Sequence, residues 1–126
     1  IKSFKTDRQI ACNLLLESKK LLDGYGIAQT IRKNNQNVVF GVEEKPRKPK
    51  SDLVILPVYA FKPTIFDALK KTNQGYNKEL QVTDAIKTMI NCNKKIVAMK
   101  MKGKWFDIGT PQWYLEALNY SFKIEH

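Results

Sequence analysis

The sequence has few of the residues that metal centres and disulfide frameworks require. It contains two cysteines and one histidine, and the histidine is the last residue of the chain. Cys12 and Cys92 lie far apart and form no C-x-x-C pair, so the usual zinc-site spacing is absent. Both cysteines lie beside apolar residues, and we expect both to be buried as small hydrophobic side chains.

Long hydrophobic runs are missing as well. No apolar stretch approaches the roughly 20 residues that span a bilayer, and no charged-then-apolar signal peptide opens the chain. These absences predict a soluble, cytoplasmic protein without a membrane partner. Hydrophobic residues make up 43% of the 126 residues and charged residues 27%, which is typical of one globular domain or part of a larger one.

Charge of one sign dominates, since 22 lysines and arginines stand against 12 acidic residues and give a net charge of +10. Such a balance is common in nucleic-acid-binding proteins. The basic residues are spread along the whole chain, however, and no RNP-like aromatic motif, helix-turn-helix pattern or zinc finger accompanies them. We therefore do not expect nucleic acid as the main partner, because an anionic small substrate explains the charge as well.

Hydrophobic patterning predicts strands and helices in mixed order. Apolar and alternating runs indicate strands at 10–17, 27–31, 38–42, 53–61, 95–102 and around 105–108. Helical spacing indicates helices at 64–71, at 83–91 capped by Thr83, and from Pro111 onward capped by Thr110. This mixture predicts the α/β class with a mixed β-sheet and flanking helices.

Five details of this pattern predict specific local structure. An Asn-rich turn at 33–37 would join two strands into a hairpin, and a further turn is expected at Asp23-Gly24. Pro57 lies inside a strand, which implies a bulge or an unpaired edge. Phe66 is expected on the inner side of the 64–71 helix. The last helix is expected to turn four side chains inward: Tyr114, Leu115, Leu118 and Phe122.

Polar residues with chemical potential occur near predicted strand ends. Glu44 and Lys45 follow one strand, and Asp107 precedes a tight Gly-Thr-Pro turn. Lysine is suited to phosphate, glutamate accepts hydrogen bonds from hydroxyl groups, and Mg²⁺ prefers one or two carboxylates plus substrate phosphates. Together these residue types describe a site for a sugar phosphate and a divalent metal.

Each residue also has a simpler interpretation. Glu44 and Lys45 could be solvated loop charges, Asp107 could only initiate a turn, and Gly26 could serve backbone geometry alone. The aromatic residues would by default pack in or around the core: Tyr59, Trp105 and Trp113.

Ordered motifs make the sequence resemble the sugar-1-phosphate nucleotidylyltransferases, also called nucleoside-diphosphate-sugar pyrophosphorylases. The motifs are Tyr25-Gly26, Glu44-Lys45-Pro46, Tyr59-Ala60-Phe61, Glu79-Leu80-Gln81-Val82-Thr83-Asp84 and Trp105-Phe106-Asp107-Ile108-Gly109-Thr110-Pro111. The resemblance extends over 23–122. It implies a partial Rossmann-like nucleotidyltransferase fold and transfer of a nucleotidyl group from a nucleoside triphosphate to a sugar 1-phosphate.

The resemblance also implies roles for single residues. Gly26 would offer its backbone N–H to a sugar hydroxyl, Glu44 would bind the sugar ring, and Lys45 would contact the sugar phosphate. Asp107 would be one of two aspartates holding a catalytic Mg²⁺. The residues expected to line the sugar pocket less directly are Tyr59, Glu79 and Trp105.

Two departures from the family pattern matter. Pro57 stands where the family usually has a glycine, so the resemblance does not define the sugar contacts at this position. The Gly-rich phosphate loop and the second metal-binding aspartate do not occur in the sequence. We therefore expect residues 1–126 to be the sugar-phosphate-binding, C-terminal half of the catalytic domain, inactive alone, with the nucleotide-binding N-terminal half outside this chain. The start at Ile1 rather than at methionine fits this expectation.

Several alternatives stay open. Glucose 1-phosphate with dTTP or UTP is the first expectation for the substrates, ahead of mannose 1-phosphate with GTP. A non-catalytic sugar-nucleotide sensor and a basic nucleic-acid-binding module are the competing functions. We also expect an unpaired sheet edge or an exposed apolar face where the other half docks, which homo-oligomerisation could cover.

Overall fold

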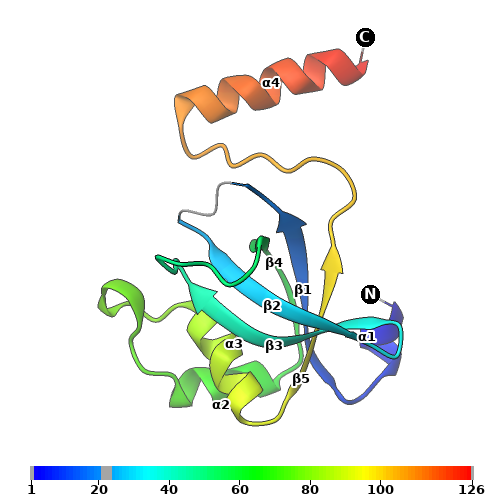
Figure 1. Ribbon diagram of the computed structural model, residues 1–126, viewed down its shortest axis with the longest axis vertical. Coiled ribbons are helices and arrows are strands. Elements are labelled where there is room, and N and C mark those ends of the chain that lie inside the picture. The colour runs from blue at the N-terminus through cyan, green and yellow to red at the C-terminus, as the bar shows by residue number, and fades with distance from the viewer. Residues whose placement is uncertain (1, 21–23, 126) are drawn as a thin grey trace.

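The computed structural model describes residues 2–20 and 24–125. Its strands are β1 (Ile10–Ser18), β2 (Gly26–Lys33), β3 (Gln36–Glu44), β4 (Leu53–Phe61) and β5 (Lys95–Lys100). Its helices are α1 (Lys2–Thr6), α2 (Thr64–Lys71), α3 (Val82–Asn91) and α4 (Pro111–Glu125), with a short 3-10 turn at Tyr76–Lys78. The expected α/β class with a mixed sheet and flanking helices is confirmed (Figure 1).

The described strands close into a small barrel in the order β1-β4-β2-β3-β5. β1 and β5 pair in parallel, and every other neighbouring pair is antiparallel. The expected unpaired sheet edge is therefore wrong for these strands. Closure removes the edges because β5, the last strand along the chain, pairs with both β1 and β3.

The β2–β3 hairpin is confirmed, with a shorter turn than the sequence suggests. The strands pair from Gly26 opposite Glu44 to Lys33 opposite Gln36, which leaves a two-residue turn. Asn34 and Asn35 form this turn with φ angles of 46° and 62°. Two successive left-handed residues are typical of a type I′ turn, and asparagine tolerates that conformation better than most residues do.

Pro57 produces the irregularity that its position predicts. Leu14 of β1 lies opposite Tyr59, but Leu16 lies opposite Ile55, so the register shifts beside the proline. Pro57 is exposed and lies outside the regular ladder of β4. The bulge is confirmed, and it has a simple cause, since proline has no N–H to donate to the neighbouring strand.

α2 and α3 cover one side of the barrel and complete the main core. Ile86 and Met89 of α3 are buried, as the helical spacing predicts. Two details were wrong. The residue that caps α3 is Gln81, and Thr83 is a buried residue inside the helix. Phe66 of α2 is 64% exposed, because the inner face of that helix is formed by Ile65 and Ala68.

The C-terminal segment departs most from the sequence-based expectation. Residues 105–108 form no strand. Thr110 caps α4 as expected, since its Oγ1 accepts a hydrogen bond from the Trp113 backbone N–H at 3.3 Å. The apolar side chains of α4 do not turn inward, however, and the four residues expected to do so are 39–65% exposed. Figure 1 shows α4 standing apart from the barrel, so it has little core to pack against.

Three smaller expectations concern single residues and membrane partners. Cys12 is buried as expected, whereas Cys92 is exposed just after α3, so its expected burial was wrong. Gly24 has a φ of 83°, which suits a turn, but its expected partner Asp23 lies outside the described residues. Among the helices in the described part of the chain, none combines the length and apolar character needed to cross a membrane.

Candidate functional site

Gly26 is the point at which polar side chains from separate elements come together. It is the first residue of β2 and lies opposite Glu44 at the end of β3. A methyl group built on Gly26 would lie 2.9 Å from Thr83 Oγ1 of α3 and 3.1 Å from Glu44 Oε2. Both distances are shorter than ordinary contacts, so this position requires glycine because of close approach rather than because of a turn.

Glu44 and Lys45 lie at the end of the same hairpin. The side chain of Glu44 is only 12% exposed, and its Oε1 lies 4.0 Å from Lys45 Nζ. Lys45 leaves the strand with a φ of 43°, and its backbone N–H donates to the Tyr25 carbonyl at 3.1 Å. The expected carboxylate and ammonium are therefore held side by side, beside the Tyr25-Gly26 motif.

Tyr59 lies close enough to this group to be affected by its charge. It is half-buried on β4 and stacks on Phe61 with ring centroids 5.5 Å apart. Burial raises the pKa of its phenol above the ordinary value, and the negative charge of Glu44 raises it further. Tyr59 is consequently a neutral hydroxyl at physiological pH, beside an acidic acceptor.

A second cluster lines a neighbouring cleft of about 660 Å³ between the barrel and α4. Trp105 and Asp107 both line it, together with Lys19 and Tyr25. Lys19 Nζ lies 4.6 Å from the Tyr25 ring centroid and 4.4 Å from that of Trp105, and the two rings meet edge to face at 6.1 Å. This cleft has aromatic walls and a cation held against them.

Asp107 forms a turn of its own while facing this cleft. Its Oδ1 accepts a hydrogen bond from the Gly109 N–H at 3.0 Å, so Asp107 does act as a turn residue, as its simpler interpretation predicts. Within the described ranges, no group of three or more acidic, histidine or cysteine side chains is placed to hold a metal. Asp107 can supply one carboxylate ligand, and a Mg²⁺ ion bound there would need substrate phosphates and ligands from elsewhere.

The expected site residues thus fall into two adjoining groups. One group consists of Gly26, Glu44, Lys45 and Tyr59, and the other consists of Trp105 and Asp107. Tyr25 connects the two, because its carbonyl binds Lys45 and its ring lines the Asp107 cleft. No hydrogen bond or ion pair between Asp107 and Glu44 is found among the residues described.

Glu79 belongs to neither group in this structure. It is exposed, and its Oε2 accepts a hydrogen bond from Gln81 Nε2 at 3.0 Å. The sequence placed it with the pocket only because of its motif, and the loop that carries it points it to solvent.

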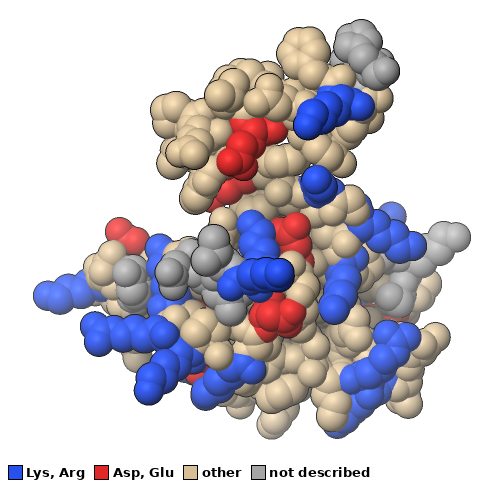
Figure 2. All heavy atoms as spheres, turned by 45° about the horizontal axis from the view of Figure 1, so that its top comes forward, with Lys and Arg blue, Asp and Glu red and all other residues tan. Residues whose placement is uncertain are grey.

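Two residues at the site were not identified from sequence. Thr83 was interpreted as a helix cap, yet it is 5% exposed and its hydroxyl points toward Gly26. Lys19 was one of many spread cations. Figure 2 shows why charge alone could not single it out, since basic side chains are distributed over much of the visible face with acidic ones between them.

Comparisons with known proteins identify the family to which the sequence is similar. Residues 1–123 match the family model described as nucleotidyl transferase. A glucose-1-phosphate thymidylyltransferase of Streptomyces antibioticus is 34% identical over 116 residues, which cover 92% of this chain and 32% of that protein. A UTP–glucose-1-phosphate uridylyltransferase of Pseudomonas aeruginosa is 35% identical over 102 residues, which cover 79% of this chain and 36% of that protein.

The solved structures give the same picture of the fold. UDP-glucose pyrophosphorylase in complex with UDP-glucose matches 97% of this chain and 47% of its own chain, with a TM-score of 0.85 and 28% identity. The chain therefore spans about a third of the length of these two curated relatives and less than half of this solved relative.

Proposed function

Because the chain belongs to the nucleotidyl transferase family, we propose that it is the sugar-phosphate-binding, C-terminal half of a sugar-1-phosphate nucleotidylyltransferase domain. The observation that carries this proposal is the convergence at Gly26. Glu44 and Thr83 approach the same glycine from β3 and α3, and Tyr59 lies close enough for the Glu44 charge to raise its pKa. Acceptors and hydroxyl groups converging beside a bare backbone suit a ligand rich in hydroxyl groups.

The proposed roles follow from these positions. The Gly26 backbone and the Glu44 carboxylate bind the sugar hydroxyls, and Thr83 is added to this group because its hydroxyl faces them. Lys45 neutralises the sugar phosphate. Tyr59 lines the pocket as a neutral phenol.

The neighbouring cleft is proposed to face the reacting phosphates. Asp107 supplies one ligand of a catalytic Mg²⁺, which would neutralise phosphate charge when bound. Trp105 forms the wall of the cleft and fixes Lys19, which adds a cation there. Glu79 is proposed to join the pocket only if its loop moves when substrate binds.

The reaction needs no protein nucleophile. An oxygen of the sugar 1-phosphate attacks the α-phosphorus of the nucleoside triphosphate, the bond from that phosphorus to the bridging oxygen breaks, and pyrophosphate leaves in line. The chain's own residues position the attacking phosphate and reduce its negative charge. Glucose 1-phosphate with dTTP or UTP is the proposed substrate pair.

The exposed apolar face of α4 is proposed to dock the nucleotide-binding half. Side chains on this face are exposed although they are large and apolar: Leu115, Leu118 and Phe122. The relatives contain about twice to three times the length of this chain, so the additional sequence is available to cover the helix. Self-association of the isolated chain at micromolar concentration that disappears when residues 111–126 are removed would show a second copy there instead.

A matched pair of glutamates tests the sugar site in the isolated chain. Glu43 and Glu44 are adjacent on β3, but Glu43 is already paired with Lys50 at 3.0 Å and lies next to Gly26 in neither register nor contact. We expect Glu44→Gln to weaken glucose 1-phosphate binding in calorimetry by about tenfold or more, since a hydrogen bond to a charged group is worth roughly 1.5–3 kcal/mol. Glu43→Gln should leave binding unchanged, and equal losses in both variants would contradict the assignment.

Turnover tests the catalytic assignment. We expect no pyrophosphate release from the isolated chain with glucose 1-phosphate and dTTP or UTP. In a protein that joins this chain to a nucleotide-binding half, we expect release that Asp107→Ala abolishes and that the exposed control Asp67→Ala retains. Release unaffected by Asp107→Ala would exclude the proposed metal role.

A further inference from the structure

A basic cavity lies at the end of the barrel opposite to the proposed site. β1 and β5 begin at this end and β4 finishes there, whereas Lys19 and Trp105 follow the other ends of β1 and β5. The cavity has a volume of about 410 Å³. Its cationic lining residues come from separate segments: Arg8, Lys62, Lys94 and Lys95. The two sites are roughly 25 Å apart, because the nine residues of β1 rise about 3.3 Å each.

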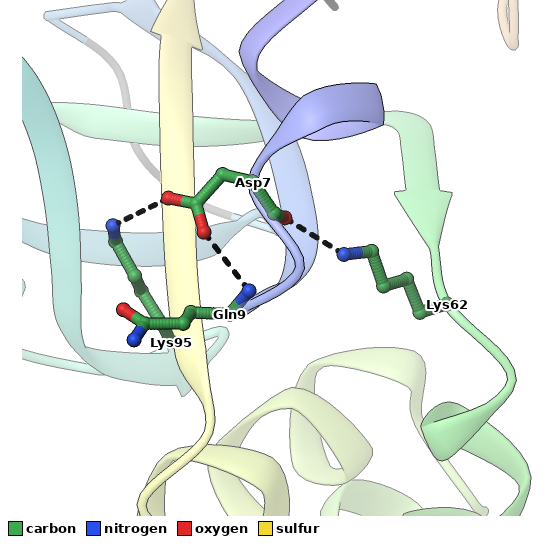
Figure 3. A network of polar contacts seen from close by, with 4 residues as sticks. All are labelled: Asp7, Gln9, Lys62 and Lys95. Carbon is green, nitrogen blue, oxygen red and sulfur yellow. Dashed lines mark hydrogen bonds and ion pairs between the residues drawn. The ribbon is translucent and has the colours of Figure 1, made fainter.

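One residue, Asp7, holds two of these four cations without neutralising the cavity. Asp7 Oδ2 lies 3.0 Å from Lys95 Nζ, and the Asp7 backbone carbonyl accepts a hydrogen bond from Lys62 Nζ at 2.8 Å (Figure 3). The bond from Lys95 and then the N–H of Gln9 hold the pKa of Asp7 below its usual range. Each lysine has further N–H donors, so both remain able to bind an anion.

The remaining lining groups have donors without partners. Arg8 and Lys94 are exposed and make no ion pair with any residue that the structure describes. Thr64 Oγ1 is buried and has no hydrogen-bond partner among the described residues. Thr64 is also the first residue of α2, where the helix dipole favours negative charge.

We propose that this cavity binds a phosphate-class anion, such as inorganic phosphate, pyrophosphate or the phosphate groups of a small metabolite. The cations converge on one concave position rather than following a stripe, which suits a compact anion better than a nucleic-acid strand. The Thr64 hydroxyl and the lysine ammonium groups donate hydrogen bonds, and Arg8 closes the open side of the cavity. This proposal does not depend on the proposed catalytic function.

Residue-resolved NMR titration of the isolated chain tests the proposal. Inorganic phosphate, pyrophosphate and a nucleoside diphosphate are titrated separately at constant ionic strength. We expect saturable shifts of the backbone amides at 62–65 and 93–95, with the strongest ligand identifying the source of the phosphate group. Shifts confined to residues 19–26 and 44–45, or linear shifts of all exposed lysines, would overturn the proposal.

Variants separate this cavity from the proposed catalytic site. We expect Arg8→Gln/Lys94→Gln to weaken binding at the cavity by about tenfold, because two charge-assisted donors are lost. The exposed lysines of α2 provide a matched control, and Lys70→Gln/Lys71→Gln should retain affinity. Lys45→Gln should also retain the cavity shifts, and their loss in that variant would show that the anion binds at the other end.

A conservative single substitution provides an independent test in case the Arg8→Gln/Lys94→Gln protein does not fold. Thr64→Val keeps the shape of the side chain and removes only the hydroxyl, so we expect weaker phosphate binding with retained thermal stability. If Thr64→Val and Arg8→Gln/Lys94→Gln both bind phosphate with unchanged affinity, the proposed anion site is wrong. Tighter binding of a single-stranded oligonucleotide than of pyrophosphate, lost in the same double variant, would favour a nucleic-acid surface instead.

Discussion

Gly26→Ala is the substitution whose effect the structure defines most clearly. The new methyl group would lie 2.9 Å from Thr83 Oγ1, 3.1 Å from Glu44 Oε2 and 3.6 Å from Ile55 Cδ1. Glycine at this position has no positive φ, so alanine suits the backbone. Alanine also lowers the conformational entropy of the unfolded chain, which by itself would stabilise the fold by about 0.4–1 kcal/mol. Overpacking at a buried position typically costs about 1–3 kcal/mol.

The cost of overpacking should exceed the stabilisation that alanine provides through the unfolded chain. Glu44 can rotate away, whereas Thr83 is β-branched and buried within α3, so rotation of its side chain is restricted. We therefore expect a net loss of about 1–2 kcal/mol in the free energy of unfolding. This loss corresponds to a decrease in Tm of roughly 4–8 °C per kcal/mol for a small domain.

Urea unfolding followed by tryptophan fluorescence measures this loss. Gly41→Ala is a matched control on β3, because its methyl group would meet only the amide end of Gln29, which can move aside. Removing the obstructing hydroxyl in Gly26→Ala/Thr83→Ala should restore part of the loss, which appears as a coupling free energy in a double-mutant cycle. A Gly26→Ala protein that is more stable than the parent would refute the close-approach argument.

Three further predictions concern other parts of the chain. Burial raises the pKa of Cys12 to about 12, so an Ellman titration of the folded protein should label the exposed Cys92 alone and reach Cys12 only on unfolding. Asn34→Val should lower the free energy of unfolding by about 1–2 kcal/mol in urea melts, because a β-branched residue cannot adopt its left-handed φ easily, whereas Asn34→Gly should be neutral or stabilising. The lowered pKa of Asp7 contributes stability above the ordinary value of 3.8 that is lost as the pH falls through the folded value. Asp7→Asn should therefore lower the urea midpoint of unfolding at pH 7. Below pH 3.8 the midpoint of this variant should fall less steeply with decreasing pH than that of the parent protein.

Local chemistry made several features predictable from sequence. The register shift at Pro57 follows from its missing N–H, and the Thr110 cap with Pro111 at the first turn marks the start of α4. The position of the Glu44-Lys45 pair was also predictable, because the two residues lie at the end of the second strand of the hairpin.

Long-range pairing was not predictable in the same way. Nothing local in β5 indicates that it joins β1 and β3 and so closes the barrel. The apolar residues of α4 have helical spacing whether or not a core exists to bury them, so their exposure depends on what surrounds the helix. Residues 105–108 contain three large apolar side chains, which suggested a strand, but they have no neighbouring strand in the described structure with which to pair.

The parallel pairing of β1 with β5 has a consequence for biosynthesis. Leu14 lies opposite Ala98, so one side of β1 stays without its partner until nearly the whole barrel sequence has been made. At a synthesis rate of about 5–20 residues per second, this interval lasts several seconds. During that time the nascent strand presents unpaired backbone groups next to apolar side chains, which makes early chaperone engagement or aggregation more probable than later in folding.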